Sequence, residues 1–420
     1  MKYTIQETFV RLARRVPGVL YEPAEIPVKR RPAILVMHSD EDYLTCPTGP
    51  EMAGRGYRVL CANVMSKEGF FFSQIEKMTA VKAAVLFLRG RENVEKIYLM
   101  GHSGGATLMT AYQAIAENGP DIFRQESYIL PYPSDEMLPP ADGLILPDAN
   151  WGNAVMQLFS LDPAVEDEET GTRLDPEHNL FEDKNGFRED GSHFSEEFIR
   201  RFLTRQGERN NRVLDHALAR YRLIQAGRGL YSDDEPLVIP GANQGFFNNK
   251  LYAQDTRLMS HTKEPRMLVH ADGSVTKEIV PSLRGPENPR SMTHSLLEGG
   301  RIMTVYNYLS SYAVRTTPDY WYGEDRVEGI DWHSTYNSPV GNVEYIHAPT
   351  LILGMTAGWE YLASETIYEH SAAASREIAF IEGATHKFSP DRSREKYPGQ
   401  FGDTMKTLHD YMAEWIESQT

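Results

Sequence analysis

Residues 97–106 are the segment that most constrains how this chain folds. Four apolar or aromatic residues predict a buried strand, which runs directly into the sequence GHSGG at residues 101–105. A helical pattern begins at Ala106, so Gly-x-Ser-x-Gly lies in a strand–turn–helix context. Bulkier residues in place of the two outer glycines would collide in so sharp a turn. We therefore predict that Ser103 is a nucleophile at the carboxyl edge of a sheet, above the positive end of a helix dipole.

The segments around this turn alternate between strand and helix patterns. Short continuous apolar runs are typical of strands that are buried on both faces, and apolar residues at three- and four-residue spacing indicate helices. The alternation predicts an α/β fold with a mostly parallel sheet flanked by helices. We expect strands at 18–21, 32–38, 57–64, 97–100, 143–146, 349–355 and 378–381, and helices at 50–56, 72–89, 106–118 and 402–416.

A long polar segment interrupts this alternation. Residues 151–337 are rich in Asp, Asn and Tyr and have longer loops than the flanking segments. We interpret them as a large inserted, mainly helical lid domain. The α/β core then consists of residues 1–150 and 338–420. Within the lid we expect helices at 195–206, 212–226 and 303–314, and a hairpin at 267–280.

Composition disfavours several kinds of partner. A net charge of −16 argues against nucleic acid, whose phosphates require a basic surface. No apolar run is long enough to span a membrane, and the N-terminal residues lack the apolar core of a signal peptide. Cys46 and Cys61 form neither a disulfide framework nor a zinc motif. We expect a cytoplasmic protein without a metal or a cofactor.

A nucleophilic serine needs a base to accept its proton, and His386 is the best candidate. It follows the predicted strand 378–381 in the sequence Gly-Ala-Thr-His. Because the carboxyl ends of parallel strands meet at one edge of a sheet, His386 can reach Ser103 despite their separation along the chain.

The base in turn needs a carboxylate that fixes its tautomer. Glu360 is the acid nearest to the end of the predicted strand 349–355, and we favour it. Asp148, at the end of the predicted strand 143–146, is the alternative. Both positions lie at the carboxyl edge of the sheet.

Acyl transfer also needs donors for the developing oxyanion. The backbone N–H of Gly104, directly after the nucleophile, is one expected donor. The second is expected from Ser39 or Asp40, in the turn after the strand that ends at His38. For His38 itself we expect a structural role, in which its ring holds this turn by hydrogen bonds.

The order serine, acid, histidine, together with the GHSGG turn, resembles the α/β-hydrolase superfamily. The resemblance covers residues 1–150 and 338–420, and it is specific at residues 101–105 and 383–386. It implies a mostly parallel sheet with Ser103 as nucleophile and His386 as base. Two features depart from the family pattern: a serine follows His38 where glycine is usual, and no aspartate follows the penultimate strand.

An insertion after the strand at 143–146 is where this superfamily places its cap. A cap excludes water and shapes the substrate pocket. Trp151 and Trp359 are candidates for binding a small-molecule substrate, although aromatic residues also pack in cores. Nothing in the sequence excludes a homo-oligomer.

These features predict a serine hydrolase that cleaves an ester-type bond, or an amide or thioester bond, through an acyl-enzyme. One alternative keeps the fold and changes the reaction to hydrolysis of a C–C bond or to acyl transfer. Another is a ligand-binding protein without catalytic activity, which the GHSGG turn and His386 disfavour.

Overall fold

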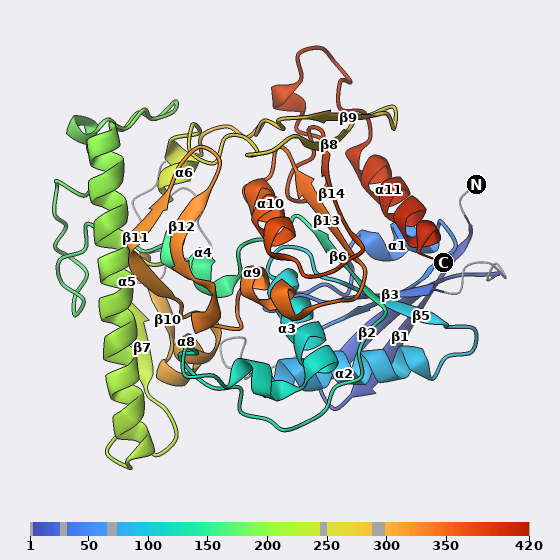
Figure 1. Ribbon diagram of the computed structural model, residues 1–420, viewed down its shortest axis with the longest axis horizontal. Coiled ribbons are helices and arrows are strands. Elements are labelled where there is room, and N and C mark those ends of the chain that lie inside the picture. Colours follow the sequence, from blue (N-terminus) through green and yellow to red (C-terminus); the bar gives the residue numbers. More distant parts are fainter. Residues whose placement is uncertain (1–2, 26–31, 65–73, 244–249, 288–298, 420) are drawn as a thin grey trace.

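A ten-stranded sheet forms the centre of the computed structural model (Figure 1), which describes residues 3–25, 32–64, 74–243, 250–287 and 299–419. Its strands from β4 to β8 run parallel, and antiparallel strands extend it at both edges. This confirms the predicted mostly parallel sheet. In spatial order the strands are β1 (Ile5–Ala13), β2 (Val16–Pro23), β4 (Arg58–Ala62), β3 (Pro32–Val36), β5 (Lys96–Met100), β6 (Gly143–Pro147), β13 (Thr350–Met355), β14 (Arg376–Ile381), β8 (Arg266–Val269) and β9 (Val275–Glu278).

Helices cover both faces of this sheet. Alternate residues of the central strand β3 point to opposite faces, as strand geometry requires: Leu35 packs in one apolar cluster and Ile34 in the other. The first cluster includes residues of α2 (Gln74–Arg89), α3 (Gly105–Asn118), α9 (Pro339–Asn342) and α10 (Tyr361–His370). The second includes residues of α1 (Thr48–Ala53) and α11 (Thr404–Ser418). The fully buried strands explain the continuous apolar runs in the sequence.

The predicted core helices and strands are present in the structure with small shifts at their ends. The helix expected at 106–118 is α3, and the one expected at 402–416 is α11. The first two residues of the helix expected at 72–89 lie outside the described residues. Strand β1 was not predicted, because its exposed edge position leaves it without an apolar run.

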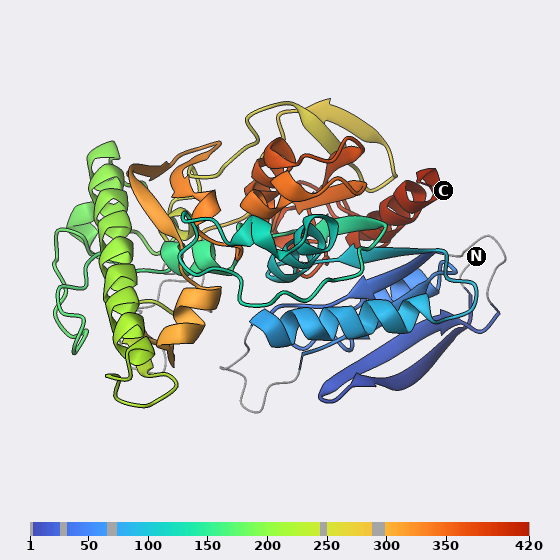
Figure 2. The same cartoon turned by 60° about the horizontal axis from the view of Figure 1, so that its bottom comes forward.

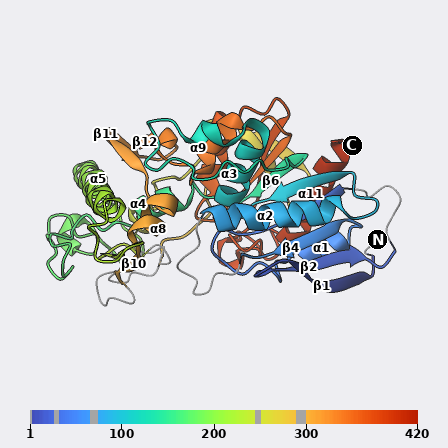
Figure 3. The same cartoon turned by 90° about the horizontal axis from the view of Figure 1, so that it is seen from below.

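The segment 151–337 lies mostly at the end of the molecule opposite the two termini (Figure 1, Figure 2 and Figure 3), with the long helix α5 (Glu196–Gln225) at its outer side. Our prediction of two helices, 195–206 and 212–226, was wrong, because α5 is continuous through residues 207–211. Gly207, inside this helix, allows close packing: a Cβ there would lie 2.9 Å from the Tyr320 ring. The polar Asn210 that follows is buried and donates to the carbonyl of Val314 (2.8 Å).

Other parts of this segment also differ from expectation. The helix predicted at 303–314 is present as the shorter α8 (Val305–Ser311). The residues before it form strand β10 (Arg301–Thr304), which pairs with β7 (Pro236–Ile239). The hairpin predicted at 267–280 forms as β8 and β9, but it extends the main sheet beside β14. The other described helices and strands of this segment are α4 (Asn153–Phe159), α6 (Leu251–Gln254), β11 (Arg315–Tyr322) and β12 (Val327–Asp331). Short 3-10 turns occur in this segment at Asp183–Asn185 and Trp332–Ser334, and elsewhere at Pro120–Phe123, Val343–Tyr345 and Arg392–Arg394. The division of the chain at 150 and 337 stays a prediction.

The described ranges contain no helix that combines the length and the apolar character needed to cross a bilayer. Cys46 and Cys61 are both buried free thiols.

One buried ion pair attaches the loops of this segment to α5. Arg209 is fully buried, and its guanidinium donates two bonds of 2.7 Å to the carboxylate of Glu168. It also donates to the carbonyls of Asp162 and Pro240, each at 2.7 Å. Removal of this side chain therefore leaves three acceptors, on two separate loops, without their donor.

We predict that Arg209→Ala lowers the free energy of unfolding by about 2–3 kcal/mol, somewhat less than for a fully enclosed pair because Glu168 is partly exposed. Urea denaturation followed by tryptophan fluorescence measures the loss. Arg212→Ala, at an exposed position of the same helix, is the control and is expected to change stability by less than about 0.5 kcal/mol. Equal losses in both variants would contradict the structural role of the Arg209 pair.

Candidate active site

The turn between β5 and α3 holds Ser103 in a strained conformation. Its φ angle is +56°, in the left-handed region that non-glycine residues rarely adopt. A Cβ at Gly101 would lie 2.6 Å from the carbonyl oxygen of Gly105, and one at Gly105 would lie 2.6 Å from that of Met37. The steric reason inferred for these two glycines is thus confirmed. Ser103 lies directly before the N-terminal end of α3, whose first residue is Gly105.

Asp148 and His386 meet beside this turn. Asp148 directly follows β6, and its side chain is fully buried. The His386 Nδ1–H donates to Asp148 Oδ2 (2.6 Å), and the Met355 N–H donates to Asp148 Oδ1 (3.0 Å). The backbone N–H of Ser103 donates to the carbonyl oxygen of Asp148 (3.2 Å), which ties the serine turn to the residue that holds the histidine.

Glu360, the acid favoured by the sequence, lies near His386 Nδ1 but does not accept its hydrogen bond. It lies immediately before α10, its side chain is 1% exposed, and its Oε2 is 3.3 Å from His386 Nδ1. Among the described residues no hydrogen-bond donor reaches this oxygen. The structure therefore gives the bond to the alternative acid, Asp148, because that residue follows its strand directly whereas a turn separates Glu360 from β13.

The two carboxylates dominate the electrostatics of the histidine. Burial alone lowers the pKa of His386, but the charges of Glu360 and Asp148 outweigh it and raise that pKa to about 9. Burial raises the pKa of Glu360 to about 7, and repulsion from Asp148 acts in the same direction against attraction by His386 and Lys250.

The turn after β3 and the serine turn after β5 each leave one backbone donor beside the serine. His38 Nδ1 accepts the N–H groups of Asp40 (3.1 Å) and Glu41 (2.9 Å), which confirms the structural role expected for His38. Burial lowers the pKa of His38, in keeping with an unprotonated Nδ1. In the described part of the chain, the N–H groups of Ser39 and Gly104 have no hydrogen-bond partner. The two residues are neighbours, since a Cβ at Gly104 would lie 2.9 Å from Ser39 Oγ.

His102, the residue before the nucleophile, braces the loop that carries His386. Its Nε2 is 2.8 Å from the carbonyl oxygen of His386, and its Nδ1 is 2.5 Å from the hydroxyl of Tyr43. Because a carbonyl only accepts, Nε2 carries the proton and Nδ1 accepts from Tyr43. Burial lowers the pKa of His102 well below its ordinary value, and the neighbouring His386 and His38 act in the same direction, so the ring is neutral. Sequence reasoning missed this role, although His102 lies inside the GHSGG motif.

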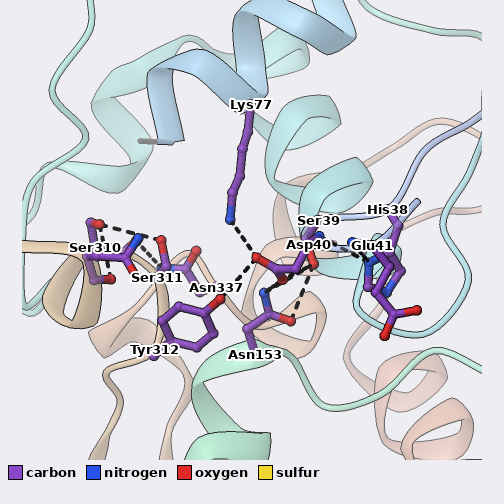
Figure 4. Close-up of polar contacts among 11 residues, drawn as sticks. His38, Ser39, Asp40, Glu41, Lys77, Asn153, Ser310, Ser311, Tyr312 and Asn337 are labelled. Atoms are coloured by element: carbon purple, nitrogen blue, oxygen red, sulfur yellow. Dashed lines mark hydrogen bonds and ion pairs between the residues drawn. The ribbon is translucent and has the colours of Figure 1, made fainter. Parts of the chain in front are cut away.

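A second polar cluster surrounds Asp40 next to the serine (Figure 4). Tyr312 donates to Asp40 Oδ1 (3.0 Å), Lys77 lies 3.3 Å from the same oxygen, and Asn153 donates to Oδ2 (2.6 Å). Ser39 Oγ also donates to Oδ2 (2.6 Å). Burial opposes this charge, but Lys77 and the donors Ser39 and Tyr312 prevail and hold the pKa of Asp40 well below its usual range. No local sequence pattern indicates this cluster, because its members come from four distant segments.

Ser103 opens into a pocket of about 220 Å³. Most of the residues around it are polar or charged: they are His38, Asp40, Glu41, Ser103, Gly104, Asn150, Asn153, Met156, Arg301, Tyr312 and Glu360. The two tryptophans predicted to bind substrate, Trp151 and Trp359, do not line it. Trp151 is fully buried and packs on Phe159 in the core, and Trp359 packs near Tyr252. Two larger hollows, of about 530 and 640 Å³, lie along the N-terminal part of α5, away from the serine.

One group of residues has the spacing of a metal site. Ligand atoms of His102, Asp148 and His386 lie within 4.8 Å of one another. Both ring nitrogens of His102 and the Nδ1 of His386 are already engaged in the hydrogen bonds described above. These residues therefore fit a proton-transfer network better than a metal site.

The parallel sheet with helices on both faces and the serine turn between β5 and α3 define the α/β-hydrolase fold. No family model and no curated protein matches the chain. Similar solved structures are the siderophore hydrolase EstB from Aspergillus fumigatus (11% identity, 99% of this chain and 98% of that chain, TM-score 0.46), the α/β hydrolase GrgF from Penicillium sp. sh18 (11%, 99% and 99%, 0.43) and Est1E from Butyrivibrio proteoclasticus (12%, 98% and 98%, 0.40). The fold assignment rests on the sheet and the serine turn rather than on these likenesses.

We predict that Gly358→Ala lowers the rate of any reaction that depends on the Asp148–His386 bond by at least about tenfold. A Cβ at Gly358 would lie 2.6 Å from Asp148 Oδ2, the atom that accepts from His386, so the carboxylate has to move. The measurement is the rate of Ser103 labelling by a fluorophosphonate. Gly90→Ala, where a Cβ meets only ordinary contacts of 3.5 Å and more, is the control. An unchanged labelling rate in the Gly358 variant would show that the close packing of Gly358 against Asp148 does not affect the Asp148–His386 bond.

Proposed function

We propose that this protein is a serine hydrolase that cleaves an ester-type bond of a small polar molecule. The observation that carries the proposal is the strained Ser103 turn, bonded through its backbone to Asp148, which in turn accepts the Nδ1–H of His386. In this arrangement Nε2 of His386 is left as the basic nitrogen, as a serine base requires.

The proposed reaction proceeds through an acyl-enzyme. Ser103 Oγ attacks the carbonyl carbon while His386 takes its proton, and Asp148 stabilises the resulting imidazolium. The N–H groups of Gly104 and Ser39 donate to the oxyanion; Asp40 is excluded as a donor because its N–H is bonded to His38. Collapse of the tetrahedral intermediate expels the alcohol, which receives the proton from His386. Water then attacks the acyl-enzyme with the same assistance and restores Ser103.

The pocket supports a small polar substrate. A volume of about 220 Å³ leaves room for few non-hydrogen atoms. Asn150 and Arg301 offer hydrogen-bond donors around it, whereas the donors of Asn153 and Tyr312 are already bonded to Asp40 and Ser39, and Met156 is the apolar side chain among its walls. These features favour short, polar acyl or alcohol groups over long lipid chains.

We predict that Ser103→Ala abolishes hydrolysis of short-chain p-nitrophenyl esters. Asp148→Asn should lower kcat by at least about a hundredfold, because an amide cannot stabilise the imidazolium. Release of p-nitrophenol measures both effects, and circular dichroism verifies folding. Asp142→Asn, a surface acid that precedes the same strand, is the control. Activity retained by a purified, folded Ser103→Ala protein would rule out the proposed function.

A further inference from the structure

Two buried carboxylates face one imidazole N–H in this site, and a single proton cannot serve both. Asp148 Oδ2 is 2.6 Å from His386 Nδ1, whereas Glu360 Oε2 is 3.3 Å away. The second oxygen of Asp148 accepts the N–H of Met355. Oε2 of Glu360 is buried without a donor among the described residues. The two acids therefore stand in unequal environments although they face the same atom.

This inequality disfavours the charged form of Glu360. The Asp148 carboxylate accepts two N–H groups, one on each oxygen, whereas, within the described part of the chain, Oε2 of Glu360 accepts none and the only backbone donor to that carboxylate is the N–H of Glu360 itself. Burial and the nearby negative charge of Asp148 both favour the protonated form of Glu360. The pKa of Glu360, raised by burial to about 7, agrees with this preference.

The other charged and titratable groups around His386 do not replace Glu360 in this role. His102 and His38 are kept neutral by burial, and Tyr43 has its pKa raised by burial, so its hydroxyl stays protonated. The charge of Glu41, in the turn after β3, also raises the pKa of His386, but by less than the charges of Glu360 and Asp148 do. The positive charge of the buried Lys250 favours the ionised form of Glu360. Burial raises the pKa of Tyr252, so its hydroxyl stays protonated. Asp40 and Lys77 form an ion pair, so their opposite charges offset each other.

We propose that Glu360 is a second carboxylate of the active site, whose charge beside His386 sets the pH at which His386 becomes a base. This inference rests on the proposed function, in which His386 must be neutral to accept the serine proton. Glu360 acts through His386 and is therefore a positioning residue. The acid that orients the ring is Asp148.

The arrangement has a consequence for the pH dependence of the enzyme. As the pH rises through about 7, Glu360 loses its proton and becomes negatively charged. This negative charge raises the pKa of His386. His386 then loses its proton and becomes a neutral base only at higher pH, near its raised pKa of about 9. Removal of the Glu360 charge should lower the pKa of His386, so that the neutral base exists at lower pH. At high pH the weaker base should react somewhat more slowly.

The test is the rate constant for fluorophosphonate labelling of Ser103, measured by intact-protein mass spectrometry from about pH 5 to about pH 10. We expect the Glu360→Gln variant to reach half of its maximal rate at least about one pH unit below the wild-type protein. At neutral pH it should therefore label faster than the wild type. Glu369→Gln makes the same chemical change at a partly exposed position of α10 and should leave the midpoint unchanged.

A second measurement follows His386 directly. Histidine labelled with ¹³C at Cε1 gives a titration curve by NMR, and His386→Gln assigns the signal. We expect the same downward shift of the midpoint in Glu360→Gln, in the absence of any substrate or probe. This readout remains available if Ser103 is not labelled at any pH, an outcome that would overturn the proposed function rather than this inference.

Two results would overturn the role given to Glu360. One is a midpoint that is the same in the wild type and in Glu360→Gln. The other is a maximal labelling rate that falls further in Glu360→Gln than in Asp148→Asn, which would make Glu360 the acid that orients the histidine.

Discussion

The hydrogen bond from His386 to Asp148 is the contact on which the rest of the site depends. It connects a loop after β14 to the end of β6, two strands separated in the sheet by β13. Asp148 itself holds a positive φ angle of 44°, and its backbone carbonyl accepts the Ser103 N–H. One buried residue thereby positions both the nucleophile turn and the proposed base. The sheet provides the rigidity that such a geometry needs, because its strands at this point are fully buried on both faces.

A layer of neutral hydrogen-bonding groups supports this contact. His102 bonds the backbone of His386, Tyr43 bonds His102, and His38 holds the turn that presents Ser39. Burial keeps the two histidines uncharged, so three imidazoles lie close together without mutual repulsion. Among the groups that surround His386 most closely, charge is thus left to His386 itself and to the two acids beside it.

Local patterns in the sequence were sufficient to predict the core. Gly101 and Gly105 indicated the sharp turn at Ser103, and the apolar runs of the buried strands predicted the parallel sheet. The acid was not predictable in this way. Asp148 and Glu360 both follow strands, and the choice between them depends on turn geometry that no short sequence pattern encodes. Tertiary contacts likewise shape α5, which is one continuous helix where two were predicted and in which Gly207 allows close packing against Tyr320.

Peptide mapping after treatment with a fluorophosphonate tests the central claim most directly, because it needs no knowledge of the substrate. The account predicts a single phosphonylated residue, Ser103, and loss of the adduct when the same protein is unfolded before treatment, since reactivity then lacks His386 and the oxyanion donors. An adduct at another residue, or none in the folded protein at alkaline pH, would contradict it.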